Sequence, residues 1–228
     1  MTEEEKKKLF DDWPEAYDRW FTTPIGALVK KYEGELIQDL LRPAQGEVIL
    51  DAGCGTGGFT SDMVSSGSDV IGLDISLPMI RRARQKIRGR HFQVVAGDLL
   101  RLPFPENSFD KAVSVTTLEF IEDAAGAFQE LFRVTRKGGC VVAATLNSRS
   151  PWAARRRAES KMKDSIFSKA IFRSPEELRS LIPVEGLVRT AIHFQKEDNP
   201  DRASDIELEG RRKRLETGAF VAGRWEKR

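Results

Sequence analysis

One acidic residue and four glycines lie close together in the stretch VILDAGCGTGGFT, residues 48–60. Asp51 comes directly before the turn, and the glycines are Gly53, Gly55, Gly57 and Gly58. Apolar β-formers that lead into a glycine turn and then a helical pattern predict a strand, a turn and a helix. Glycine permits positive φ angles and lets the backbone approach a ligand closely. The stretch therefore predicts a ligand-binding turn at the end of a strand.

Two ligand classes fit this turn, beside the alternative that it binds nothing. Gly53, Gly55 and Gly58 satisfy the GxGxxG spacing, and the acidic Asp74 follows, as in dinucleotide-binding folds. A dinucleotide such as NAD would place its pyrophosphate on the turn, where the Asp51 carboxylate would repel it. A ligand with an ammonium group, a ribose and an adenine but no phosphate fits better. S-adenosylmethionine has these groups, and we favour it.

Composition limits the classes of protein that the chain can represent. Its 228 residues, 40% hydrophobic and 32% charged, suffice for one α/β domain with a small appendage. The net charge of +2 argues against a polyanion-binding protein. The two cysteines, Cys54 and Cys140, form no disulfide framework or metal-binding spacing, so we expect no metal. Without an apolar leader or an apolar run of membrane-spanning length, we expect a cytoplasmic protein with no membrane span.

Short strands alternate with helices in the middle of the chain, as in a parallel sheet covered on both faces. We expect strands at residues 48–50, 70–73, 92–96, 111–115 and 140–145. We expect helices at residues 59–64, 76–87 and 124–135, the second with Ser76 as its N-cap. Ligands of such sheets bind beyond the carboxyl ends of the strands.

Helical and β-like segments flank this core. Residues 3–21 have a helical pattern rich in aromatic residues, although Pro14 can interrupt it, and a second helix is expected from Pro24 to about Leu41. Residues 150–173 are basic and helical, and residues 174–177 start another helix. Residues 187–194 and 219–225 are β-like, and residues 196–217 form a solvated hairpin loop or short helix. We therefore expect a helical cap (1–45), a ligand-binding core (46–147) and a region that completes the same domain (148–228).

Three acids, Asp51, Asp74 and Asp98, follow successive predicted strands within the motifs VILDAGCGTGGFT, VIGLDIS and GDLLRLPFPENSFD. Over residues 46–147 these motifs resemble the class I S-adenosylmethionine-dependent methyltransferases, small-molecule branch, which includes the ubiquinone and menaquinone methyltransferases. The resemblance implies a Rossmann-like, seven-stranded, mostly parallel sheet flanked by helices.

The resemblance also implies a cofactor site. It places the methionine part at the turn, the ribose at Asp74, and the adenine beside Ile75, Met79, Asp98 and Leu99. Val115 and Thr116 would lie beside the sulfonium, and Tyr17 would lie near the methionine end or the acceptor, or else belong to a packed helix face. The expected cofactor-binding residues are Tyr17, Asp51, Ala52, Gly53, Gly55, Gly57, Asp74, Ile75, Met79, Asp98, Leu99, Val115 and Thr116.

Many members of this family carry a His pair where this chain has Glu119 and Phe120. Glu119 is the candidate catalytic base, and its alternative is an ordinary surface carboxylate at a helix start. The implied function is in-line methyl transfer to O, N or C of a small molecule. The alternatives are a noncatalytic cofactor-binding or scaffold protein, or an NAD-linked oxidoreductase.

The acceptor pocket is expected from residues 10–25 and 147–180, which are rich in Trp, Phe and Arg. This mixture favours an aromatic or amphipathic acceptor with an anionic group. The run Arg155–Arg157 invites a nucleic-acid reading, but a solvated helical face is the more common meaning, and we expect no nucleic-acid partner. His193 is expected to be a satisfied sheet residue. The sequence leaves the oligomeric state open.

Overall fold

The computed structural model describes residues 10–160 and 166–228. A seven-stranded sheet with the order β3-β2-β1-β4-β5-β7-β6 forms its centre. The strands are β1 (Val48–Ala52), β2 (Asp69–Asp74), β3 (Phe92–Ala96), β4 (Phe109–Val115), β5 (Thr135–Leu146), β6 (Gly186–Ala191) and β7 (Phe220–Glu226). β1 to β5 pair in parallel, whereas β7 is antiparallel to both β5 and β6. The predicted fold class, a mostly parallel Rossmann-like sheet, is confirmed.

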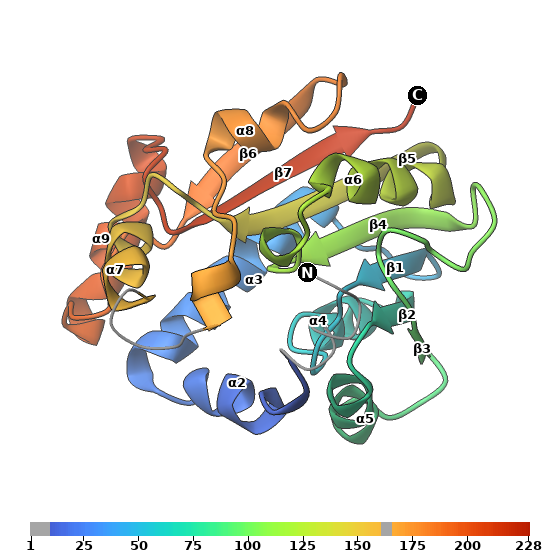
Figure 1. Cartoon of the computed structure of the whole chain (residues 1–228), viewed down its shortest axis with the longest axis horizontal. Helices are drawn as coiled ribbons and strands as arrows, with labels where there is room; N and C mark the ends of the chain where they lie inside the picture. Colours follow the sequence, from blue (N-terminus) through green and yellow to red (C-terminus); the bar gives the residue numbers. More distant parts are fainter. Residues whose placement is uncertain (1–9, 161–165) are drawn as a thin grey trace.

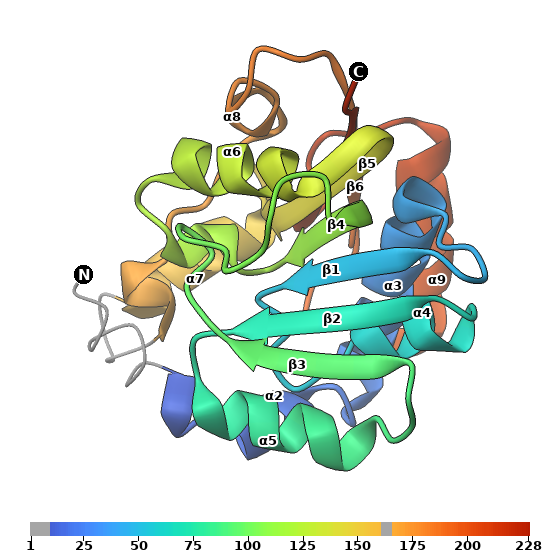
Figure 2. The same cartoon turned by 90° about the vertical axis from the view of Figure 1, so that its right-hand side faces the viewer.

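Helices cover both faces of the sheet (Figures 1 and 2). One face carries α3 (Pro24–Leu41), α4 (Thr60–Ser65), α5 (Leu77–Lys86) and α9 (Pro200–Arg212), and the other carries α6 (Ala124–Val134) and α8 (Pro175–Arg179). Two further helices, α2 (Pro14–Trp20) and α7 (Pro151–Ser160), and the short 3₁₀ helices η1 (Leu118–Phe120) and η2 (Ile166–Lys169) complete the described elements.

Successive strand residues point to opposite faces and so build two cores. On β1, Ile49 packs with α3 and α4, whereas Leu50 packs with α6; both are fully buried. Because both faces are covered, β1 reads as a continuous apolar run rather than an alternating one. Since both faces of the sheet are covered by apolar packing, polar side chains gather at the carboxyl ends of the central strands.

Three helical segments can be compared with the sequence expectation. In the described part of residues 3–21, the helix is interrupted before Pro14, which begins α2 at a position where its missing N–H costs nothing. The basic segment 150–173 is helical in α7 and η2, and residues 161–165 lie outside the described residues. Of the two alternatives for residues 196–217, the structure shows the helix, since residues 200–212 form α9, with Ala203 and Glu207 buried.

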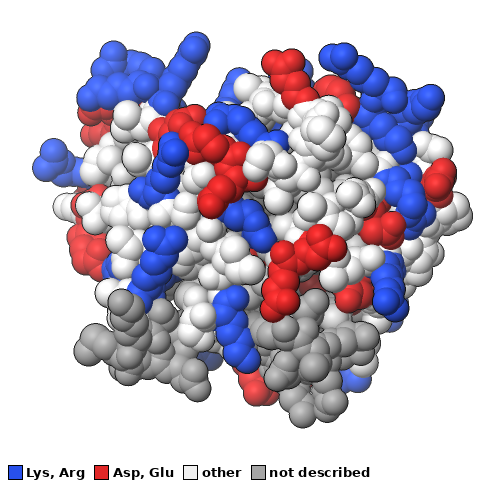
Figure 3. Space-filling view, turned by 45° about the horizontal axis from the view of Figure 1, so that its top comes forward, with Lys and Arg blue, Asp and Glu red and all other residues white. Residues whose placement is uncertain are grey.

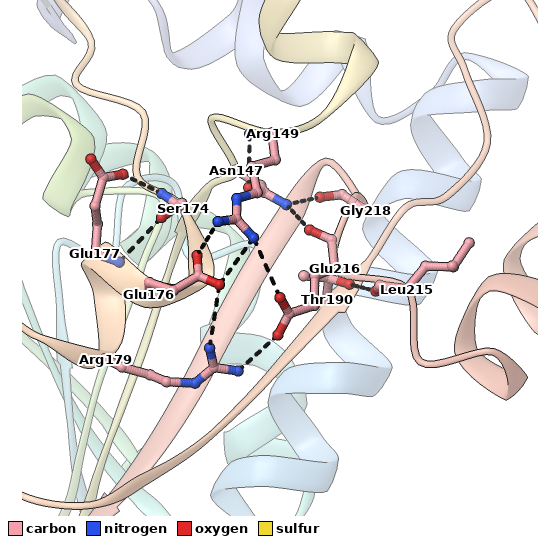
Figure 4. Close-up of polar contacts among 10 residues, drawn as sticks. All are labelled: Asn147, Arg149, Ser174, Glu176, Glu177, Arg179, Thr190, Leu215, Glu216 and Gly218. Atoms are coloured by element: carbon pink, nitrogen blue, oxygen red, sulfur yellow. Dashed lines mark hydrogen bonds and ion pairs between the residues drawn. The ribbon is translucent and has the colours of Figure 1, made fainter.

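A polar network fixes the segment that follows β5 (Figure 4). The Asn147 amide donates to the carbonyls of Glu216 and Gly218, at 2.8 and 2.7 Å, just before β7. Arg149 and Arg179 both pair with the Glu216 carboxylate, and Arg149 also reaches Glu176 on α8. The network therefore ties the start of α7 to α8 and to the approach to β7.

Charges of both signs are interspersed on the face of the molecule in Figure 3. This distribution agrees with the net charge of +2. The described chain contains no helix that is both long enough and apolar enough to traverse a bilayer.

Candidate active site

A cavity of about 420 Å³ lies at the carboxyl ends of β1, β2 and β4. The glycine turn after β1 and the loops after β2, β3 and β4 form its floor, and α2, α3 and α7 contribute its walls. Its aromatic lining includes Phe10, Trp13, Tyr17, Trp20, Phe21, Trp152 and Phe167. The segments 10–25 and 147–180 therefore meet around the same cavity.

The glycine turn approaches the cavity at Gly53 and Gly55, whose φ angles are 84° and 52°. No atom lies within 4 Å of a Cβ built on Gly55, so that position faces open space. Gly57 has a different role, because a Cβ there would lie 2.7 Å from Ile87 at the end of α5. Gly57 thus permits the turn to pack on α5.

Asp51 is 3% exposed and accepts a hydrogen bond of 2.6 Å from the Thr60 hydroxyl. Burial raises its pKa to about 7, and the nearby Asp74 adds to the shift. Asp74 accepts from the backbone N–H groups of Gly55 and Ser76, at 2.8 and 2.9 Å. Burial raises the pKa of Asp74 despite these bonds. The first two acids are therefore buried, and one of them organises the glycine turn.

Asp98 follows β3 by two residues and accepts from the backbone N–H of Leu100 at 3.0 Å. Both Asp98 and Leu99 line the cavity. The three acids predicted from successive strand ends are thus brought to one wall. With them the structure brings Tyr17, Gly53, Gly55, Ile75, Met79, Val115 and Thr116 to the cavity, whereas Ala52 and Gly57 lie outside its lining.

Asp18 holds α2 against the rest of the site. Its carboxylate accepts from the Thr56 hydroxyl on the glycine turn (2.7 Å), from Arg82 Nε (2.9 Å) and from Lys86 Nζ (2.6 Å) on α5. Partial burial raises its pKa, but these hydrogen bonds outweigh that effect and hold the pKa below its usual value. Ser76 Oγ also donates to Asp11, at 2.7 Å. Sequence patterns gave no sign of these contacts, because their partners are 38 to 68 residues apart.

Tyr17 on α2 faces Thr116, which follows β4. Burial of its hydroxyl raises the pKa of Tyr17, with Glu33 adding to the shift, while a hydrogen bond with Thr116 opposes it. Thr116 has a φ of 49°, a region that non-glycine residues seldom adopt and that costs about 1–3 kcal/mol. The Thr116 N–H donates to Ala144 at 2.9 Å, which holds this backbone in place.

Glu119 on η1 is 1% exposed and lines the cavity, so the reading as a surface carboxylate is wrong. Burial raises its pKa to about 7, and its carboxylate accepts from the Thr145 hydroxyl at 3.0 Å. Arg173 donates to the carbonyls of Leu118 and Ile121, at 2.7 and 3.1 Å, and so fixes the short helix that carries Glu119.

Glu33 is a further buried acid, which the sequence patterns did not reveal. It lies on α3, lines the cavity and is 6% exposed. Burial raises its pKa to about 8; Arg156 opposes the shift and Glu119 adds to it. The signal that could have revealed it is a charged residue four positions after Val29, on the apolar stripe of the helix.

Arg156 on α7 also lines the cavity, which corrects the expectation that Arg155–Arg157 form a solvated face. Its guanidinium lies 5.3 Å from the ring of Trp152 and 4.6 Å from the ring of Phe167. His193 is a further correction, because both of its ring nitrogens are buried and have no hydrogen-bond partner among the described residues. The described residues hold no cluster of His, Cys, Asp and Glu suited to a metal ion.

A methyltransferase-domain family profile matches residues 50–143, which include the glycine turn and the three acids. Residues 50–143 therefore form a methyltransferase domain of the class I S-adenosylmethionine-dependent type. This finding agrees with the family predicted from the sequence and favours it over an NAD-linked oxidoreductase.

Three proteins illustrate what this chain is similar to. A demethylmenaquinone methyltransferase of Roseiflexus castenholzii is 44% identical over 94 residues, 40% of each chain. A malonyl-[acyl-carrier protein] O-methyltransferase of Pseudescherichia vulneris is 39% identical over 109 residues, 48% of this chain and 41% of that protein. This chain therefore spans less than half the length of these two relatives. The crystal structure of a methyltransferase from Thermotoga maritima, titled a possible histamine N-methyltransferase, is 26% identical with a TM-score of 0.72 and covers 97% and 99% of the two chains.

Proposed function

We propose that this chain binds S-adenosylmethionine in the cavity and transfers its methyl group to a small-molecule acceptor. The supporting observation is the charge of the cavity wall. In the described chain, six carboxylates line it (Glu33, Asp51, Asp74, Asp98, Glu119 and Glu159), against three cationic side chains (Arg155, Arg156 and Lys196). S-adenosylmethionine has a net positive charge and no phosphate, so it is complementary to such a wall.

The residues fit the parts of this cofactor one by one. The open space at Gly55 leaves room for close backbone contact, and the buried Asp51 suits an ammonium group. Asp74 can accept from the two vicinal ribose hydroxyls, since a carboxylate has about four lone-pair sites and two of them already serve Gly55 and Ser76. Asp98 and Leu99 would meet the adenine, with Ile75 and Met79 on its faces. Val115, Thr116 and Tyr17 would lie at the methyl-bearing end.

The sulfonium supplies an electrophilic methyl group when the cofactor is bound. The chain then has to orient the acceptor and exclude water from the reacting atoms. Tyr17 and the other aromatic residues of the lining would exclude water. They can do so because the contact of Asp18 with Thr56 holds α2 at one side of the cavity. Glu119 is the proposed base where the acceptor must lose a proton, since a pKa of about 7 suits proton transfer near neutral pH. The similar proteins differ in the acceptor that their names give, so likeness alone does not choose among O, N and C.

Calorimetry with S-adenosylhomocysteine, together with a transfer assay using labelled cofactor and a metabolite extract, tests this function. We expect binding of S-adenosylhomocysteine, no binding of NAD, and label on at least one metabolite. Absence of S-adenosylhomocysteine binding would refute the proposal. Tight binding with no labelled product from any extract would favour the alternative, a noncatalytic cofactor-binding or scaffold protein.

A further inference from the structure

The acceptor side of the cavity contains two buried carboxyl groups from different elements. Glu33 comes from α3 and Glu119 from η1; both line the cavity, and the charge of Glu119 raises the pKa of Glu33. Glu119 accepts a hydrogen bond from Thr145, whereas no hydrogen bond is among the influences on the pKa of Glu33. Burial makes the charged form of such a carboxyl group costly. Because Glu33 lines the cavity, a cationic ligand there would stabilise its charged form.

The charged groups around the pair decide which kind of ligand fits. Arg156 on α7 and Tyr17 on α2 line the same cavity; the charge of Arg156 lowers the pKa of both carboxyls, and the charges of both carboxyls raise the pKa of Tyr17. Arg173 is not part of the cavity lining, and its guanidinium donates to the carbonyls of Leu118, Ile121 and Ile171. Its positive charge lowers the pKa of Glu119. Within the cavity, two carboxylates therefore meet one guanidinium. One additional positive charge balances them when both acids are ionised.

The walls around the pair suit a cation with an apolar body. Trp20, Trp152 and Phe167 line the same cavity, and the faces of aromatic rings attract cations. An anionic acceptor would instead place like charge beside Glu33 and Glu119. The inference therefore departs from the sequence-based expectation of an acceptor with an anionic group, which drew on the arginine content of these segments.

We propose that Glu33 and Glu119 together bind the nitrogen of a protonated amine with an aromatic or aliphatic body, and that this amine is the methyl acceptor. The inference rests on the proposed function, because it names the acceptor class of the same site. It assigns Glu33 as an acceptor-binding residue and makes the chain an N-methyltransferase.

The pair also accounts for the proton that must leave before the amine can react. The ammonium group gives one proton to a carboxylate of the pair, which later releases it to solvent. The nitrogen lone pair then forms the N–C bond while the methyl C–S bond breaks and its electron pair goes to sulfur. The products are the methylated ammonium ion and S-adenosylhomocysteine. The ordinary pKa of a carboxylate is too low for this role, and burial brings Glu33 and Glu119 to about 8 and 7.

Three probes of similar shape and different charge test the acceptor class: phenethylamine, phenethyl alcohol and hydrocinnamate. Each is titrated into the complex of the full chain with S-adenosylhomocysteine at pH 7.5. We expect the amine to bind at least about tenfold more tightly than the alcohol or the carboxylate. Equal affinities, tighter binding of the carboxylate, or no binding of the amine would overturn the proposal without any variant.

Glu33→Gln tests the residue, with Glu35→Gln as the matched control. Glu35 lies on the same helix two residues further on, partly exposed and paired with Arg211. We expect Glu33→Gln to weaken the amine about tenfold while the alcohol is unaffected, and Glu35→Gln to change neither. S-adenosylhomocysteine affinity should stay within about threefold in both variants, which also reports on folding. Unchanged amine affinity in a cofactor-binding Glu33→Gln protein would overturn the assignment.

Transfer assays separate this inference from the function on which it rests. Label on the nitrogen of phenethylamine, with a KM raised in Glu33→Gln, supports both. Label on phenols, carboxylates or carbon acceptors but on no amine would leave methyl transfer standing and refute the amine. Failure to bind S-adenosylhomocysteine would refute the proposed function itself.

Discussion

At the scale of single residues, the site combines carboxylates whose surroundings differ. Hydrogen bonds from two backbone N–H groups stabilise the charged form of Asp74, whereas no hydrogen bond is among the influences on the pKa of Glu33. The Asp74 carboxylate is held by the glycine turn and also lines the cavity. Its position should therefore be the same with and without a bound ligand. The charged form of Glu33 depends on the ligand instead.

Asp74→Ala should weaken S-adenosylhomocysteine binding by about 1–3 kcal/mol, because two backbone N–H groups and two ribose hydroxyls would lose their acceptor. Isothermal calorimetry measures the change. Asp69→Ala is the control, since Asp69 begins the same strand, is about half exposed and pairs with His91. Equal affinities for the wild type and Asp74→Ala would contradict the ribose assignment.

The stability of the cofactor-free protein should fall as the pH rises from about 4.5 to about 8. Burial raises the pKa of Glu33 from 4.5 to about 8, and those of Glu119 and Asp51 to about 7. The folded state holds these protons more tightly than the unfolded state does. Each group therefore contributes its full stabilisation of the folded state at pH values below its unfolded-state pKa. This stabilisation is lost as the pH rises through the folded-state pKa.

Glu33→Gln should therefore be more stable than the wild type at pH 8.5 by about 1–3 kcal/mol, and nearly equal to it at pH 4.5. Urea denaturation at pH 4.5, 6.5 and 8.5 tests this expectation, with Glu35→Gln as the exposed control. The opposite order of stability at pH 8.5 would show that Arg156 already compensates the Glu33 charge.

Residue types and spacing were enough to predict the three acids and the cavity-facing glycines, because a strand end followed by a turn fixes where a short side chain must lie. They were not enough for Glu33. Its carboxylate faces Arg156 and Glu119, which are 123 and 86 positions away along the chain, so its environment depends on tertiary packing. For the same reason, the contact between Asp18 and Thr56 could not be predicted from the sequence. Gly57 fits the glycine motif, but it packs on α5 and does not line the cavity.

At the scale of elements, α2 is a short helix that closes the cavity. Seven residues are too few for a stable isolated helix, so tertiary contacts must hold it. Asp18 supplies these contacts to both the glycine turn and α5, and Figure 1 shows α2 beside α5. The position of Tyr17, one residue earlier, depends on the same anchor.

Asp18→Ala should release α2 without unfolding the sheet. We expect faster hydrogen exchange in residues 14–20 and S-adenosylhomocysteine binding weakened by about 1–2 kcal/mol, because Tyr17 and the Thr56 hydroxyl lose their fixed positions. Glu15→Ala, an exposed position on the same helix, should change neither quantity. Slow exchange retained in α2 of Asp18→Ala would mean that the aromatic contacts suffice.

At the scale of the whole molecule, the family match ends at residue 143 but the sheet does not. β7 lies between β5 and β6, so residues 186–226 complete the layer on which α3 and α8 pack. Trp225 on β7 is fully buried and meets the ring of Phe128 on α6 edge-on, with centroids 4.8 Å apart. Gly186 and Gly223 leave the space that its indole occupies, since a Cβ at either position would lie within 2.5 Å of that ring.

Trp225→Ala should lower the free energy of unfolding by about 3–5 kcal/mol, because it leaves a cavity between α6 and the antiparallel part of the sheet. Trp225→Phe should cost clearly less, since the ring contact with Phe128 is retained and the indole N–H has no partner among the described residues to lose. Urea denaturation measures both variants. Because the three acids lie on or directly after β1, β2 and β3, at the other side of the sheet, S-adenosylhomocysteine affinity should persist in Trp225→Ala at temperatures where it remains folded. A loss below about 1 kcal/mol would show that the region after residue 143 packs as a separable appendage. A loss of several kcal/mol in unfolding with unchanged affinity would show that stability and cofactor binding depend on opposite sides of one cooperative sheet.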